Sequence, residues 1–114
     1  MIDAHKTVVT ALKSVLPCHW ELQIDSTTET PCITYLERNN SDTVTGDTLG
    51  YSDLSYTIKV WAHTVTELQK YGAKVDTAMR KIGFTRGACY EMYDPNSTMK
   101  QKIMTFDAMG VEAF

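Results

Sequence analysis

The chain lacks the features that mark exported and membrane-spanning proteins. It has only three cysteines, Cys18, Cys32 and Cys89, an odd number at distant positions. This pattern excludes a disulfide framework, and we expect reduced thiols in a cytosolic setting. No apolar run approaches the ~20 residues of a membrane span, so no membrane partner is expected. The N-terminal stretch contains Asp3 and several polar breaks, which is not the pattern of a signal peptide.

An excess of positive charge is missing as well. Eleven Lys and Arg residues stand against 14 Asp and Glu residues, a formal net charge of −3. No global positive field therefore attracts nucleic acid. A basic strip is nevertheless present, formed by Lys70, Lys74, Lys81, Lys100 and Lys102. Such strips are usually solvated faces, and nucleic-acid contact is the minority interpretation.

Motifs that carry catalysis or hold a cofactor are also absent. The sequence has no G-x-G-x-x-G, Walker loop, G-x-S-x-G or H-E-x-x-H. Cys18 and His19 are adjacent, but no cysteine or histidine lies at the spacing of a metal site. Asp42 and Asp47 share one segment without the calcium-loop pattern. We expect no catalytic residue, no metal and no cofactor.

What the sequence does have is clear hydrophobic periodicity. A helical period runs over residues 4–16, with Asp3 as N-cap, and ends at Pro17. Alternation predicts strands at residues 20–24 and 32–38. A second helix follows Thr64, whose spacing to Glu67 is that of a capping box, and closes at Gly83. Strands are then expected at residues 84–93 and 98–109, joined by a turn that contains Pro95.

The longest predicted strand covers residues 51–63, where apolar and mostly polar positions alternate throughout. Thirteen extended residues reach about 43 Å, at ~3.3 Å each, against a diameter of about 34 Å for a compact domain of this size. The preceding segment, residues 39–50, is rich in Asn, Asp, Thr and Gly and is expected to be a flexible hairpin loop. Together they predict a long hairpin arm, although a bent strand with a mobile tip is an equal alternative.

The predicted fold class is α+β, in a single domain of residues 1–114. Two helices pack on one face of a mainly antiparallel sheet, in the order α-β-β-β-α-β-β with a long hairpin arm. Residues 110–114 are expected to form a C-terminal tail. On the outward face of the long strand, Tyr51 and Trp61 are large aromatic groups on a mostly polar surface, which favours a protein interface.

Two strands and a helix resemble those of a known family. A Pro-x-Ile-x-Tyr strand at residues 31–35 is followed by a variable loop and a Tyr-x-Ile-x-Val-Trp strand at residues 56–61. This strand leads directly into the amphipathic helix that closes at Gly83-Phe84, and two strands complete the pattern. In this order the chain resembles the tail-terminator and head–tail joining proteins of long-tailed bacteriophages. The match spans nearly the whole chain but contains no catalytic motif.

The resemblance implies a structural protein of the virion, not an enzyme, which forms a ring, typically a hexamer, at the end of the tail tube. Its partners would be copies of itself, the tail tube protein and the head connector proteins. DNA would pass through the channel without specific binding, and assembly would take place in the bacterial host cytoplasm. The segment 39–51 would be the arm that meets a neighbour. A tail tube or connector adaptor role fits the same features.

The predicted interface residues lie in the expected arm and on the outward face of the long strand. They are Asp42, Thr43, Asp47, Leu49, Tyr51, Asp53, Lys59 and Trp61. An alternative from another class is a small cytosolic enzyme or ligand-binding domain. Its chemistry would come from Cys18, His19, Cys32 or His63, since such residues can meet in space without a local motif.

Overall fold

A computed structural model describes residues 3–21, 29–45, 48–93 and 99–111 of the chain. The expected fold class is confirmed: two helices and a mostly antiparallel five-stranded sheet, in the order α-β-β-β-α-β-β. The elements are α1 (His5–Lys13), β1 (Cys18–Trp20), β2 (Cys32–Thr45), β3 (Thr48–Ala62), α2 (Val65–Lys81), β4 (Thr85–Tyr93) and β5 (Lys100–Val111). Neither helix of the described chain is long and apolar enough to cross a lipid bilayer.

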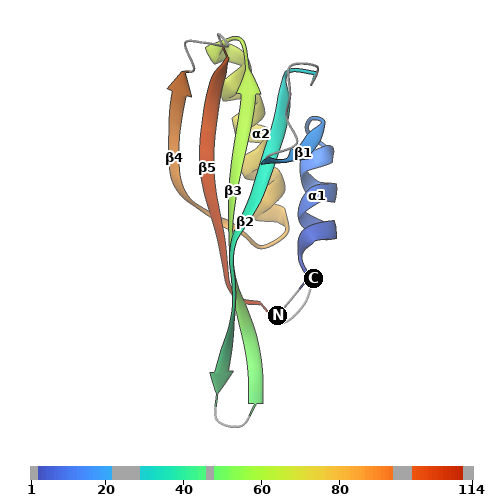
Figure 1. Cartoon of the computed structure of the whole chain (residues 1–114), viewed down its shortest axis with the longest axis vertical. Coiled ribbons are helices and arrows are strands. Elements are labelled where there is room, and N and C mark those ends of the chain that lie inside the picture. The colour runs from blue at the N-terminus through green and yellow to red at the C-terminus, as the bar shows by residue number, and fades with distance from the viewer. Residues whose placement is uncertain (1–2, 22–28, 46–47, 94–98, 112–114) are drawn as a thin grey trace.

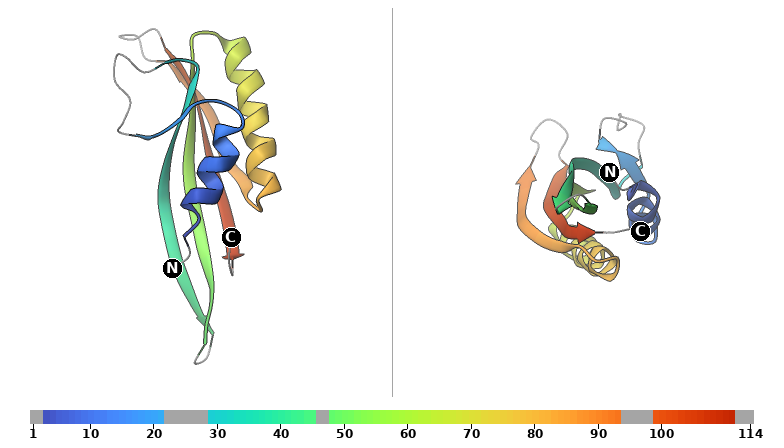
Figure 2. Two further views of the ribbon diagram at one scale, coloured as in Figure 1. Left: turned by 90° about the vertical axis from the view of Figure 1, so that its right-hand side faces the viewer. Right: turned by 90° about the horizontal axis from the view of Figure 1, so that it is seen from below.

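The sheet has the strand order β1-β2-β3-β5-β4, so β3 is central and β4 forms one edge. Both helices lie on the same side of it (Figure 1; Figure 2). The three long pairings are antiparallel, while the short β1 runs parallel to β2, with Cys18 opposite Ile33. This parallel pairing differs from the expected antiparallel one. The chain leaves α1 beside the start of β2, so β1 and β2 begin at the same end of the sheet. Most of the strand expected at residues 20–24 lies outside the described residues.

The second helix begins and ends where its sequence predicts. Thr64 is the N-cap, and its hydroxyl accepts the backbone N–H of Glu67 at 3.2 Å. At the other end Gly83 adopts φ +99°, a conformation that only glycine takes without strain. The N–H of Phe84 bonds to the carbonyl of Met79 and that of Gly83 to the carbonyl of Arg80, which is a Schellman motif.

The core lies between the helices and the sheet. The inward face of β3 contributes five buried side chains, those of Leu54, Tyr56, Ile58, Val60 and Ala62. Against them pack three groups of buried residues, Val8 and Leu12 from α1, Leu68, Val75 and Met79 from α2, and Phe84, Met104 and Phe106 around β4 and β5. Tyr56 and Phe84 meet edge to face with ring centroids 5.7 Å apart.

The prediction of a flexible loop at residues 39–50 is wrong for most of this segment. Residues 39–45 belong to β2 and residues 48–50 to β3, and they pair up to Thr45 opposite Thr48, with a register shift between Thr43 and Val44. Threonine and valine favour extended backbone, and each strand satisfies the other's hydrogen-bonding groups. Gly110 and Val111, expected in the tail, belong to β5.

The expected long hairpin arm is present. The last described pair between β3 and β5 joins Ser52 to Val111, and beyond it β2 and β3 pair only with each other among the described residues. We call residues 42–52 the arm. It extends from the body along the strand direction (Figure 1) and makes the molecule 52 Å long and 23 Å in both other dimensions. The radius of gyration, 15.1 Å, exceeds the ~13 Å of a compact domain of this length.

Val75 tests the packing of α2 on the sheet. Its side chain is fully buried in the core, so Val75→Asp places a carboxylate there without a partner. We expect a loss on the order of 3–5 kcal/mol in the free energy of unfolding, measured by urea denaturation with circular dichroism. Ala73→Asp adds the same charge at an exposed position of the same helix and should change stability little. Similar losses in both variants would contradict the assigned core face.

Candidate interaction surfaces

The arm is the most unusual surface that the fold offers. Asp42 and Thr43 lie on its β2 strand, Leu49 and Tyr51 on its β3 strand, and Asp47 lies outside the described residues. Within the described chain, neither a third strand nor a helix supports it. A two-stranded hairpin alone is marginally stable in water, and its outer strand edges leave backbone groups unpaired. The arm therefore gains most from contact with another molecule.

The other three predicted interface residues, Asp53, Lys59 and Trp61, lie on β3 within the body. All three are half-buried rather than freely exposed. Lys59 forms an ion pair with Glu21. The indole Nε1 of Trp61 donates to the hydroxyl of Thr34 at 2.9 Å, and Thr34 is fully buried. The neighbouring strand β2 thus supplies a partner for the polar atom of Trp61, and the role of Trp61 in an interface stays a prediction.

The predicted set consequently divides into two separate groups. Nine residues of extended strand separate Ser52, at the base of the arm, from Trp61, a distance of about 30 Å. One group is the arm, and the other forms internal contacts on the outer face of the sheet. The sequence predicted one site because both groups lie on the same face of one strand. Their distance along that strand separates them into two.

The open edge at β4 is a second surface, which the sequence analysis missed. All nine residues of β4 are exposed, and it is the last strand of the sheet. Tyr90, Met92 and Tyr93 are each more than half exposed. The strand carries a register shift between Arg86 and Cys89, but no lysine or proline, the residues that commonly protect sheet edges. Sequence gave no signal for this edge, because strand order is a tertiary property.

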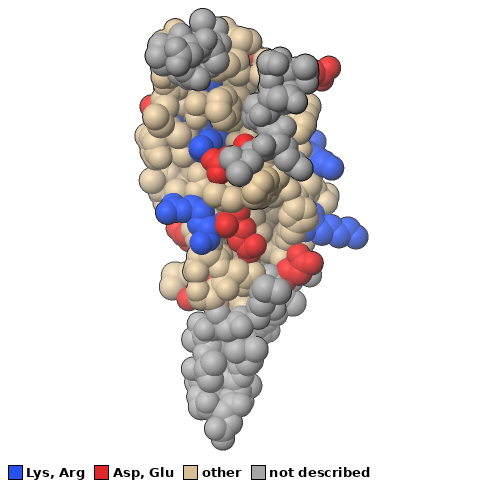
Figure 3. Space-filling view, in the orientation of Figure 1, with Lys and Arg blue, Asp and Glu red and all other residues tan. Residues whose placement is uncertain are grey.

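The outer face of the sheet carries charges of both signs. In Figure 3, which shows this face, blue and red side chains are neighbours across an otherwise uncharged surface. The residues drawn there do not form a continuous basic patch of the kind that binds nucleic acid. Two lysines of the predicted basic strip are bound within the body. Lys100 donates to the carbonyl of His63 at 2.9 Å, and Lys102 pairs with Glu91 at 3.3 Å.

The two cysteines of the alternative interpretation lie on the neighbouring strands β1 and β2, and the charge of Cys32 contributes, after burial, to the raised pKa of Cys18. Cys18 packs against the core. Cys32 precedes the core residue Ile33 in β2, so its side chain lies on the opposite face of the sheet. His63 lies at the end of β3, where its Nε2 is 3.3 Å from the hydroxyl of Thr30. Burial raises the pKa of both the Cys18 and Cys32 thiols to about 11, so they are poor nucleophiles at neutral pH.

The described residues include no group of three or more His, Cys, Asp or Glu side chains that could hold a metal ion. Two hollows stand out on the described surface. One, of about 480 Å³, lies between α1 and α2, and the other, of about 230 Å³, lies between the start of α2 and the end of β4. None of their described lining residues is a cysteine or a histidine.

Comparisons with known proteins give no family assignment. No protein-family model matches the chain, and no curated protein is significantly similar to it.

The hydrogen bond between Trp61 and Thr34 can be measured by a double-mutant cycle. Trp61→Phe removes the donor beside a buried hydroxyl and should cost about 1–2 kcal/mol of unfolding free energy. Thr34→Val in the same chain removes the acceptor too and should recover part of that loss, because no unpaired polar group remains. Tyr90→Phe, at an exposed ring, serves as the control. Strictly additive losses at Trp61 and Thr34 would exclude this bond.

Thiol labelling tests the Cys–His interpretation. At pH 8 a thiol with a pKa of about 11 has about a thousandth of its molecules as reactive thiolate. We expect iodoacetamide to modify the exposed Cys89 first, with Cys18 and Cys32 modified much more slowly in the folded protein. Labelled sites are identified by mass spectrometry, with urea-unfolded protein as the control. Fast labelling of Cys18 or Cys32 in the folded chain would reopen the enzyme interpretation.

Proposed function

We propose that the protein is a structural component of a long-tailed bacteriophage, a tail-terminator or head–tail joining protein. It acts by assembly and not by catalysis. In this role copies of the chain form a ring at the end of the tail tube, which docks on the head connector and surrounds the path of the DNA. The pattern of strands and helix at residues 31–35, 56–61 and 65–83 supports this role through its family resemblance.

The observation that carries the proposal is the arm. An antiparallel ribbon of β2 and β3 continues beyond the last described pair with β5, so its outer backbone edges are available to other molecules. A ring subunit uses such an element to hold its neighbour.

A closed ring requires two different complementary surfaces on each copy, because each subunit meets one neighbour with one surface and the next with another. The arm and the body supply such a pair. The open β4 edge, with its exposed Tyr90 and Met92, is available for the tail tube or the connector. Strand edges bind partners by adding a strand, which gives affinity without a preformed pocket.

The charge of the chain is compatible with a DNA channel. The net charge of −3 disfavours tight binding to phosphates, since neutralising phosphates requires clustered Lys and Arg. DNA can then move through the ring without being held.

Shortening the arm tests the proposal directly. Asp42 and Ser52 are partners across the hairpin, so an Asn-Gly turn can replace residues 43–51 without changing the register. We expect the wild-type chain to form an oligomer of several copies in multi-angle light scattering over a concentration series, with rings in negative-stain images. The shortened chain should be a folded monomer.

The control is the circular dichroism spectrum and melting curve of the shortened chain, which should match those of the wild type. A wild-type chain that stays monomeric at every concentration, and that does not bind tail tubes in pull-down experiments, would contradict the proposal. If the shortened chain forms the same oligomer, the arm is not needed for assembly and does not support the proposal.

A further inference from the structure

The groove between α1 and α2 is a built feature of the helical layer. Between its lysines it is lined by small or short side chains, those of Ser14, Val15, Ala73, Thr77 and Ala78. Thr77 donates to the carbonyl of Ala73 at 3.1 Å, so its methyl group rather than its hydroxyl remains available. The hollow, about 480 Å³, has room for several side chains of a docking segment.

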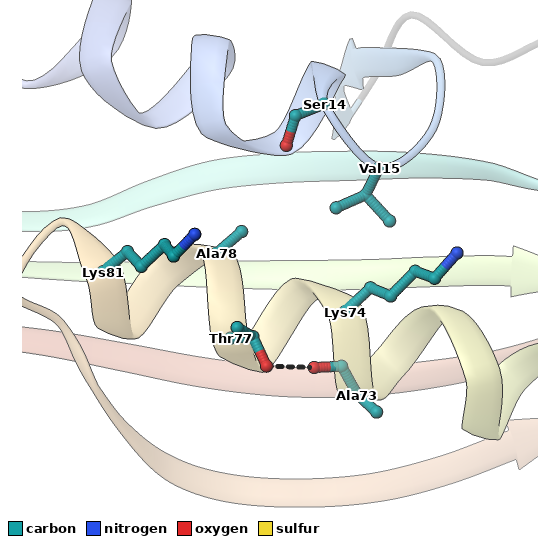
Figure 4. A pocket seen from close by; sticks show the side chains of 7 residues that line it. All are labelled: Ser14, Val15, Ala73, Lys74, Thr77, Ala78 and Lys81. Carbon is teal, nitrogen blue, oxygen red and sulfur yellow. Dashed lines mark hydrogen bonds between the residues drawn. The ribbon is translucent and has the colours of Figure 1, made fainter.

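Lysines mark both ends of this groove. Figure 4 shows Lys74 and Lys81 extending from α2 towards α1, with Ala78 between them. They are seven residues, or two helical turns, apart, which is about 10 Å along the axis. None of the described lining residues is a carboxylate, and the nearby Asp76 is paired with Arg80 at 3.0 Å. The groove therefore presents positive charge beside a lining of small side chains.

The charge distribution of the whole chain agrees with this local picture. The helices α1 and α2 hold six Lys or Arg and two Asp or Glu, a net charge of +4. All remaining residues hold five and twelve, a net charge of −7. One layer of the molecule is thus basic and the rest is acidic. A second copy that places acidic residues on the helical layer gains favourable electrostatic energy.

The arm has the complementary chemistry. Residues 42–52 contain Asp42 and Asp47 and no Lys or Arg, and Asp53 follows directly. The residues between the acids, including Val44 and Leu49, are small, apolar or hydroxyl-bearing, and suit such a lining. Because the arm continues β2 and β3 away from the body (Figure 2), it cannot fold back on the groove of its own chain. Its partner groove belongs to another copy.

We infer that the acidic arm of one copy docks in the lysine-flanked groove between α1 and α2 of the next copy. This inference rests on the proposed ring function and names its subunit contact. The contact is heterologous, so it repeats from copy to copy and closes a ring when the rotation allows. Lys74 and Lys81 contribute specificity and association rate, and the small side chains between them contribute buried area.

A charge exchange tests the contact. Lys74→Glu with Lys81→Glu should weaken self-association at least about tenfold, and Asp42→Lys with Asp47→Lys should do the same, because each places like charges together. The four substitutions in one chain restore opposite charges and should recover association to within about threefold of the wild type. Dissociation constants are measured by analytical ultracentrifugation at low and high salt.

Lys6→Glu with Lys13→Glu is the matched control. It makes the same charge change at the same seven-residue spacing, on exposed residues of α1 that do not line the groove. This control should associate like the wild type, and all variants should keep the wild-type circular dichroism spectrum. The milder Lys74→Gln with Lys81→Gln should lose less affinity than the double Glu variant.

Several results would overturn the inference. A wild-type chain that does not self-associate would remove both the ring and the contact. A wild-type oligomer that the groove substitutions leave intact, or a quadruple variant whose losses simply add, would remove only the contact. If a fluorescent DNA 20-mer binds the wild type and is lost with Lys74→Glu and Lys81→Glu while assembly is unchanged, the groove is a nucleic-acid site instead.

Discussion

The backbone pairing of β3 is the constraint on which the rest of the structure depends. From Ala62 to Leu54 this strand has β2 on one side and β5 on the other, and it buries alternate side chains beneath the helices. Past Ser52 it keeps only β2. The same strand is thus the centre of the core and one half of the arm.

The arm and the helical layer divide the tasks of assembly in the proposed ring. The inward face of α2 stabilises the fold by burying Leu68, Val75 and Met79 against the sheet. The outward face of α2 does not contribute to the core. That face and α1 collect positive charge, whereas the arm collects negative charge. Opposite charges on separate surfaces favour head-to-tail contact between copies and disfavour contact of a surface with itself. A directional assembly follows from this arrangement.

Several residues of the predicted interface and of the basic strip have partners within the chain. Trp61 and Thr34 satisfy each other's polar atoms, and Lys59 pairs with Glu21. Lys102 passes beneath α2, where its side chain occupies the space that a Cβ of Gly72 would need, and it bonds to Gln69 and Glu91. These groups join layers of the body. Outward orientation on a strand or a basic character in the sequence did not reveal such partners, which come from distant parts of the chain.

Elements with local signals could be predicted from the amino-acid sequence. Periodicity and the Thr64 and Gly83 caps predicted α2, alternation predicted β3, and the excess length of β3 predicted the arm, because each depends on backbone geometry and neighbouring residues. Other features became visible only in the folded chain: β4 is an edge, β1 is parallel to β2, residues 39–45 and 48–50 are strand, and Lys74 and Lys81 flank a groove. These properties depend on which distant segments of the chain pack together. That choice is set by the total free energy of many contacts between residues far apart in the sequence.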